Sequence, residues 1–164
     1  MSIISPVNLR IKLNALGMPA DKDYFATPNF SWQELLVNQK EIPSLIVLNN
    51  LLKVANILEV YRKLLNCPFR ITSGWRSEKY NANMKPAGAK LSQHVQGLAI
   101  DFIPLGKQVS KCYETLDVVH LGGLEKADWL HIDLRGHIAR FNNVNIALAS
   151  HFNYEKHYKL FKGA

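Results

Sequence analysis

The longest regular pattern of apolar and polar positions covers residues 44–65. Its polar residues recur near helical spacing as a stripe, and its apolar residues occupy much of the remaining surface. Pro43 suits a first turn, whereas Asn66 and Pro68 stop the pattern. The stripe consists of Asn49, Lys53, Asn56 and Lys63, and the apolar positions are Leu48, Leu51, Leu52, Ala55, Leu58 and Leu65. We predict that this segment is the main helix of the core.

Two short segments alternate between an apolar face and a face that carries polar side chains, which is the pattern of half-buried β-strands. In residues 98–102 the mixed face holds Asp101, and in residues 129–134 it holds His131 and Asp133. The opposite face of each segment carries only leucine, isoleucine or phenylalanine. We therefore expect the apolar faces to meet the core and the ionisable side chains to lie on the other side.

Weaker local signals predict the remaining elements. Ser31 and Glu34 have the spacing of a capping box, which begins a short helix. Residues 1–29 are interrupted by Pro6, Gly17, Pro19 and Pro28. We predict no long element there. The other predicted elements are this helix over about 31–39, a strand over 69–73, and helices over about 76–84, 107–120 and 142–152. The predicted fold class is α+β, with a small antiparallel sheet, helices packed on one side, and one domain over residues 1–164.

Composition narrows the class of protein. Hydrophobic residues make up 48% of the chain and charged residues 20%, as in ordinary globular proteins. No apolar run reaches the length of about 18 residues that marks a membrane span, and the N-terminus lacks the pattern of a secretory signal. We expect cytoplasmic synthesis without a signal peptide and no membrane insertion.

The chain has two cysteines, Cys67 and Cys112, which form no CxxC pair. A thiolate zinc site is therefore excluded, and we predict two buried free thiols.

The formal net charge of +7 favours an anionic partner. Much of this charge lies in residues 135–164, where Arg135, Arg140, Lys156, Lys159 and Lys162 stand against the single acid Glu155. Nucleic acid is not the expected partner, because the chain has no recognisable binding motif and its aromatic residues form no stacking array.

His94, Asp101 and His131 are the candidate metal ligands. Two imidazoles and one carboxylate hold a divalent metal and leave a position for water, which is the composition of a catalytic zinc site. Zinc lowers the pKa of such a water from about 15.7 to about 7, so hydroxide becomes available at neutral pH. A lone histidine is a weak signal in a chain with six of them. The interpretation rests on the joint occurrence of these residues on matching strand faces.

Hydrolysis also needs a carboxylate that is not a ligand, to carry a proton from the attacking water to the leaving amine. Asp128 is a candidate, but in a regular strand its odd spacing from His131 points the two side chains to opposite faces. Asp133 has the matching parity. Asp128 requires a bend or bulge near Trp129, and Glu125 is a more distant alternative. Residue spacing therefore leaves the choice between Asp128 and Asp133 open.

A positive group is expected where negative charge develops, or where a substrate carboxylate binds. Arg76 follows the predicted strand over 69–73 in the sequence Ser73-Gly74-Trp75-Arg76, and a guanidinium suits bidentate binding of a carboxylate. Trp75 beside it is a candidate for lining a substrate subsite.

The spacing Ser92-x-His94-x-x-Gly97-x-Ala99-x-Asp101, followed by Asp128-x-x-His131, closely resembles the M15 metallopeptidases. These are zinc D-Ala-D-Ala carboxypeptidases and related peptidoglycan endopeptidases, including bacteriophage endolysins. The pair Phe30-Ser31 with Glu34-Leu35 is similar to an early signature of that family. The segment Ile71-Thr72-Ser73-Gly74-Trp75-Arg76-Ser77 is similar to its Thr-Ser-Gly-Tyr-Arg-Ser segment, with Trp75 in place of the usual Tyr. Asn81 also fits, and the resemblance covers about residues 30–134.

The resemblance implies a D-Ala-D-Ala carboxypeptidase/hedgehog-like fold in which the three candidate ligands bind zinc. It gives the acid/base role to the residue three positions before the second histidine, Asp128, and so implies a local break before that strand. Many relatives have Glu there, so Asp128 has a shorter reach. Arg76 stabilises the substrate or the transition state, and Ser92 positions the loop or the substrate. The loop over residues 85–90 departs from the expected Gly-rich version, which affects the substrate rim.

The expected function is zinc-dependent hydrolysis of an amide bond in peptidoglycan stem peptides by a monomeric, phage-type endolysin. Its site of action is the bacterial cell wall, after release by a membrane-permeabilising partner. The basic residues 135–164 would then hold the protein to an anionic wall polymer. The alternative is a non-catalytic zinc-binding or phage structural domain of the same fold, against which the intact candidate site argues. The residue pattern does not distinguish a carboxypeptidase from an endopeptidase.

Overall fold

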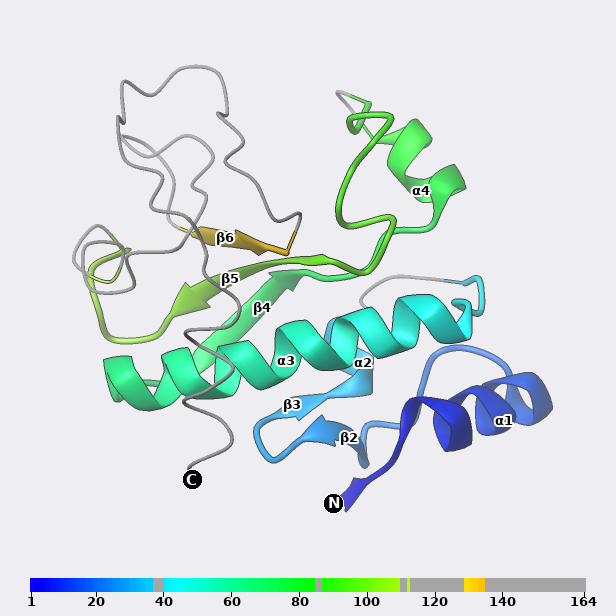
Figure 1. Cartoon of the computed structure of the whole chain (residues 1–164), viewed down its shortest axis with the longest axis horizontal. Helices are drawn as coiled ribbons and strands as arrows, with labels where there is room; N and C mark the ends of the chain where they lie inside the picture. The colour runs from blue at the N-terminus through cyan, green and yellow to red at the C-terminus, as the bar shows by residue number, and fades with distance from the viewer. Residues whose placement is uncertain (37–39, 85–86, 110–111, 113–128, 135–164) are drawn as a thin grey trace.

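The computed structural model describes residues 1–36, 40–84, 87–109, 112 and 129–134. This part of the chain forms an α+β fold in which a long helix, α3 (Leu45–Leu65), contacts a three-stranded sheet on either side (Figure 1). The predicted fold class is confirmed, but the structure has two small sheets where one was predicted.

Helix α3 matches the segment predicted from the apolar pattern. Ser44 is its N-cap and accepts a hydrogen bond of 3.2 Å from the backbone N–H of Val47, so Pro43 precedes the cap instead of occupying the first turn. Asn66 ends the helix in the left-handed conformation, with φ of 47°. The helix buries Leu48, Leu51, Val54, Ala55, Ile57, Leu58, Tyr61 and Leu65. Burial of a large apolar side chain stabilises the fold by about 1.5–3 kcal/mol, so α3 is the centre of the core.

The sheet on one side of α3 has the order β4 (Phe69–Ser73), β5 (Ala99–Pro104) and β6 (Leu130–Asp133), and both pairings are antiparallel. Asp101 lies opposite His131 in the register of β5 and β6. The predicted faces are confirmed within the strands, because Ile100, Phe102, Leu130 and Ile132 belong to the core cluster; Leu98 precedes β5, and Leu134 is only partly buried against the cluster. A register shift between Ile71 and Ser73 marks an irregularity near the end of β4.

The other sheet consists of β1 (Ser2–Ile3), β2 (Tyr24–Thr27) and β3 (Phe30–Ser31). Strand β1 pairs with β2 in parallel, whereas β2 and β3 are antiparallel. The sequence pattern did not predict this sheet, because strands of two to four residues are too short to display an alternation.

The prediction of no long element before residue 30 is wrong, because helix α1 (Pro6–Leu16) has 11 residues. Ser5 caps it by accepting a hydrogen bond of 3.3 Å from the backbone N–H of Asn8. Pro6 stands at the start of the helix, where proline costs no hydrogen bond, so it begins the helix instead of breaking it. Gly17 ends the helix with φ of 82°.

Two short helices lie within the ranges predicted for them. Helix α2 (Trp32–Leu35) begins with the predicted capping box of Ser31 and Glu34, and α4 (Glu78–Asn83) falls within the predicted 76–84. The helix predicted over 107–120 lies largely outside the described residues, and the one predicted over 142–152 lies wholly outside them.

Cys67 and Cys112 are buried free thiols, as predicted. Among the described residues, no helix has the length and apolar character needed to cross a membrane.

Candidate metal centre

The structure brings the three predicted metal ligands together. One ligand atom each from His94, Asp101 and His131 lies within 4.8 Å of the others. Oδ1 of Asp101 lies 2.6 Å from Nδ1 of His131 and 3.4 Å from Nε2 of His94. The three residues are 5%, 7% and 6% exposed, so the cluster is shielded from bulk water. Strands β5 and β6 supply two of the ligands as cross-strand neighbours, and the loop before β5 supplies the third.

The outward-facing atoms of all three side chains are held by the protein. Nδ1 of His94 donates to the carbonyl oxygen of Gly74 at 2.8 Å, since that oxygen only accepts. Oδ2 of Asp101 accepts from Nη2 of Arg76 at 3.1 Å. Nε2 of His131 lies 3.1 Å from Oδ2 of Asp133. These contacts leave Nε2 of His94, Oδ1 of Asp101 and Nδ1 of His131 to face one another. Two imidazole nitrogens and a carboxylate oxygen are a donor set that fits zinc.

The loop that carries His94 is fixed by hydrogen bonds from neighbouring elements. The indole N–H of Trp75 donates to the carbonyl of Val95 at 3.1 Å. Nδ2 of Asn50, on α3, donates to the carbonyl of Gln96 at 3.0 Å. The backbone N–H of Arg76 donates to the carbonyl of His94 at 3.2 Å. These three hydrogen bonds fix the backbone of the loop and thereby the position of His94.

Gly97 explains how this loop approaches α3. Its φ of 69° lies in the left-handed region, and a Cβ there would come within 2.7 Å of the carbonyl oxygen of Val47. Only glycine combines that conformation with so close an approach. The residue that spaces His94 from Asp101 in the sequence motif therefore has a packing role.

The end of β4 supplies two groups to which the sequence analysis assigned no role. Oγ of Ser73 accepts hydrogen bonds from Nε and Nη2 of Arg76 at 2.9 and 2.7 Å. Gly74 provides the carbonyl that holds His94, and a Cβ at Gly74 would overlap the backbone of Leu35. Both residues stand in the Ser73-Gly74-Trp75-Arg76 segment, which was the available signal. Beyond that, the sequence does not predict the contacts, because a serine hydroxyl and a backbone carbonyl are groups found throughout any chain.

The electrostatics of the cluster favour an ionised carboxylate beside the two rings. Burial raises the pKa of Asp101, but hydrogen bonds with His131 and His94 outweigh it and hold the pKa well below its usual range. Burial lowers the pKa of His131, but its hydrogen bonds with Asp101 and Asp133 outweigh that effect and raise the pKa above its ordinary value. These hydrogen bonds therefore favour the protonated ring of His131, and the one with Asp101 is made by the nitrogen that faces the cluster.

The other predicted site residues have different positions. Asp128 and Glu125 lie outside the described residues, so the acid/base role of Asp128 stays a prediction. Asp133, the alternative base, is buried and paired with His131. Trp75 is buried, and Ser92 is partly exposed at the start of the loop, so their substrate roles also stay predictions.

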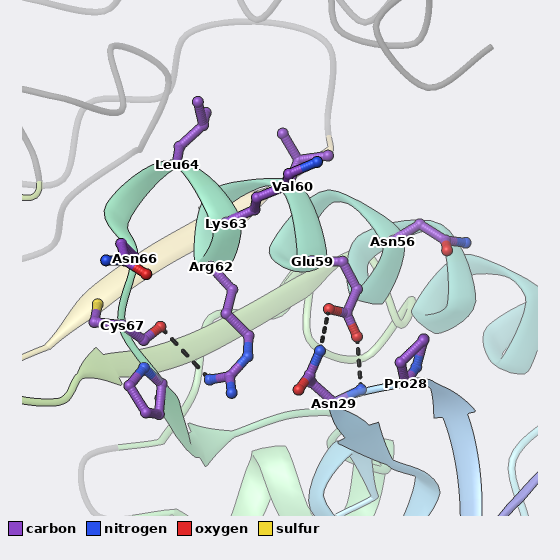
Figure 2. Close-up of a pocket in the computed structure, with 11 residues that line it drawn as sticks. Pro28, Asn29, Asn56, Glu59, Val60, Arg62, Lys63, Leu64, Asn66 and Cys67 are labelled. Atoms are coloured by element: carbon purple, nitrogen blue, oxygen red, sulfur yellow. Dashed lines mark hydrogen bonds between the residues drawn. The ribbon is translucent and has the colours of Figure 1, made fainter. Parts of the chain in front are cut away.

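A separate cavity of about 1070 Å³ lies between the last turns of α3 and the turn joining β2 to β3 (Figure 2). The carboxylate of Glu59, in its wall, accepts hydrogen bonds of 2.7 Å from the backbone N–H and the amide of Asn29. Thr27 donates a third bond of 2.7 Å to the same group. Glu59 thus joins the sheet of β1, β2 and β3 to α3. None of the predicted metal ligands lines this cavity.

The model of the Peptidase M15 family matches residues 28–133. The matched region contains β3 to β6 of the described structure and all three residues of the metal-binding cluster. The comparison with curated proteins gives no match.

Proposed function

The chain belongs to the Peptidase M15 family, and on that premise we propose that it is a zinc peptidase that hydrolyses an amide bond in peptidoglycan stem peptides. The observation that carries the proposal is the convergence of Nε2 of His94, Oδ1 of Asp101 and Nδ1 of His131, with every outward-facing atom of these side chains already bonded. Such preorganisation is typical of a metal site supported by surrounding hydrogen bonds.

When bound, zinc supplies a Lewis acid that activates water and polarises the scissile carbonyl. His94, Asp101 and His131 would hold it. Asp128 then accepts the proton of the attacking water and passes it to the nitrogen of the leaving amine as the C–N bond breaks. This role follows from the family resemblance and from the position of Asp128 three residues before His131.

Arg76 is the residue proposed to stabilise negative charge on the substrate. Its Nε and Nη2 are occupied by Ser73 and Asp101, whereas Nη1 has no partner among the described residues. The guanidinium is thus fixed at one edge and retains N–H groups for a substrate carboxylate or an oxyanion. Its side chain is 16% exposed, which leaves a path for that contact.

The cell wall as substrate is supported by the family resemblance and by the charge of the chain. A net charge of +7 favours binding to anionic polymers, and the bacterial wall carries such polymers. We propose a phage-type lysis enzyme whose basic residues 135–164 add wall affinity. Neutralising Lys156, Lys159 and Lys162 together should weaken sedimentation with purified walls, and unchanged sedimentation would contradict the role of these residues.

The decisive experiment is hydrolysis of purified peptidoglycan by the zinc-loaded protein, with mass spectrometry of the products. Release of single amino acids identifies a carboxypeptidase, and cleavage within or between stems identifies an endopeptidase. Asp128→Ala should retain zinc and lose about 10²–10⁴-fold in rate, the usual contribution of a general acid–base group. A zinc-loaded protein that is inert on varied peptidoglycans would instead be a non-catalytic zinc-binding domain.

A further inference from the structure

We propose that Asp133 is a positioning residue that holds the ring of His131 so that Nδ1 faces the metal-binding cluster. This inference rests on the proposed function, because it concerns the same zinc site. Oδ2 of Asp133 lies 3.1 Å from Nε2 of His131, and the Asp133 side chain is 0% exposed. The family resemblance assigned roles to the ligands and the acid/base residue, and it assigned none to Asp133.

The register of the sheet explains why Asp133 reaches this position. Side chains two residues apart in a strand point to the same face, so Asp133 lies beside His131 along β6. Asp101 lies opposite His131 across the pairing of β5 and β6. The imidazole therefore stands between two carboxylates, with Nδ1 at 2.6 Å from Asp101 and Nε2 at 3.1 Å from Asp133. Each ring nitrogen has its own carboxylate.

The chemistry of the contact determines which ring nitrogen can bind a metal. An ionised carboxylate only accepts hydrogen bonds, so Nε2 must carry the hydrogen in the contact with Asp133. With the Nε2 hydrogen directed to Asp133, Nδ1 is the nitrogen left to bind a metal, and it faces Asp101 and His94. A carboxylate hydrogen-bonded to the far nitrogen of a ligand histidine orients the ring, and its removal typically costs about 10–100-fold in metal affinity.

Burial strengthens the assignment. A carboxylate removed from water is costly unless it is paired, whereas the neighbouring positions Leu130 and Ile132 fill the sheet with apolar side chains. The cross-strand neighbour of Asp133 is Ala99, whose small side chain is also fully buried. The contact with His131 gives this enclosed carboxylate a polar partner in the sheet.

The test compares wild type with Asp133→Ala and the isosteric Asp133→Asn. Zinc affinity is measured by competition with a chromophoric chelator, and thermal unfolding of each metal-free protein is recorded separately. We expect Asp133→Ala to bind zinc about 10–100-fold more weakly. Asp133→Asn retains an acceptor oxygen and should recover part of the affinity. Thr27→Ala is the matched control, because it removes a hydrogen bond from the buried Thr27 of β2 to Glu59 of α3 and should leave zinc affinity unchanged.

A second readout is the ¹⁵N spectrum of the His131 ring in the zinc-loaded proteins. Wild type should coordinate through Nδ1 alone, and Asp133→Ala should show coordination through Nε2 or a mixture. Wild-type affinity and Nδ1 coordination in both variants would overturn the inference while leaving the proposed function intact. If wild type itself binds no zinc, the proposed function fails and the inference fails with it.

Discussion

Arg76 and Asp101 form an ion pair in which Nη2 of the guanidinium lies 3.1 Å from Oδ2 of the carboxylate. The oxygen that Arg76 occupies is the one that does not face the histidine rings, so the arginine directs Oδ1 toward them. A residue expected from the sequence to stabilise the substrate or the transition state thus also supports a candidate metal ligand.

Replacing Arg76 is expected to affect both zinc binding and hydrolysis. Arg76→Ala removes the partner of Oδ2, so zinc affinity should fall by about tenfold or more. Loss of the positive charge at the developing oxyanion should lower kcat by about 10²–10³-fold in the zinc-saturated protein. Chelator competition and peptidoglycan hydrolysis measure the two effects. Arg70→Ala, at an exposed position of the preceding strand β4, is the control, and equal effects of the two variants would contradict the role of Arg76.

Removal of any one candidate ligand is expected to abolish tight zinc binding. His94→Ala, Asp101→Ala and His131→Ala each leave two of the three donors, so zinc affinity should fall by more than about 100-fold, beyond the usual effect of a supporting group. Metal content after dialysis and calorimetric titration measure the loss. Gln93→Ala changes the neighbour of His94 without removing a donor and should bind zinc like wild type. Retention of stoichiometric zinc by His131→Ala would exclude this ligand set.

Zinc binding should weaken as the pH falls through the raised pKa of His131. Zinc and a proton compete for Nδ1, so below that pKa each bound metal must displace a proton, and affinity falls by up to about tenfold per pH unit. In the metal-free protein the sign is opposite. Because the folded pKa lies above the unfolded value of 6.5, the protonated ring stabilises the fold at low pH, and this contribution is lost as the pH rises through the folded pKa.

Chelator competition between about pH 8 and about pH 5 tests the first statement, and unfolding of the metal-free protein over the same range tests the second. Calorimetry in buffers of different ionisation enthalpy counts the protons released. Protonation of Asp101 does not contribute to the change in this range, because the pKa of Asp101 is held well below its usual value. Zinc affinity that does not change across the range would contradict the prediction.

Tyr61→Phe is expected to stabilise the protein. The Tyr61 hydroxyl is buried without a hydrogen-bond partner among the described residues, and removing such a group recovers about 1–3 kcal/mol of desolvation cost. Burial also raises the pKa of Tyr61. Wild type should therefore lose stability above about pH 10, where only the unfolded chain releases this proton, and the variant should lose less.

Denaturant unfolding at neutral pH and at about pH 10.5 measures both effects of this substitution. Tyr80→Phe is the matched control, because Tyr80 is 41% exposed. A Tyr61→Phe protein that is less stable than wild type at neutral pH would show that the hydroxyl has a bonding partner.

The placement of Asp101 and His131 in the sheet of β4, β5 and β6 was predictable, because side chains alternate along a strand with a strict period of two. A shift of one residue would have turned Asp101 into the apolar core and Ile100 out of it, so the apolar pattern determined that Asp101 and His131 share a face. The same parity placed Asp133 on that face. Spacing did not indicate whether Asp133 would act as a base or hold the neighbouring ring, because that depends on side-chain contacts.

Helix α1 was not predictable from its apolar pattern, because Val7, Ile11 and Leu16 are exposed and the buried residues are Pro6, Leu9 and Leu13. The pattern is therefore blurred, and the signal that remained was the cap formed by Ser5 before a proline. The contacts that complete the metal-binding cluster depend on a backbone carbonyl and a serine hydroxyl, groups that many residues share. These contacts appear only when the chain is folded.

The pairing of β1 with β2 sets a limit on how far the protein can be shortened. The family match begins at residue 28, within the turn between β2 and β3, yet the indole N–H of Trp32 donates to the carbonyl of Ile4 at 3.1 Å. A truncated protein that started at residue 28 would lose α1 and two strands. Its β3 edge would be unpaired, and the apolar side of α3 that α1 covers would face water. Such a fragment would retain every candidate ligand and would be prone to aggregate.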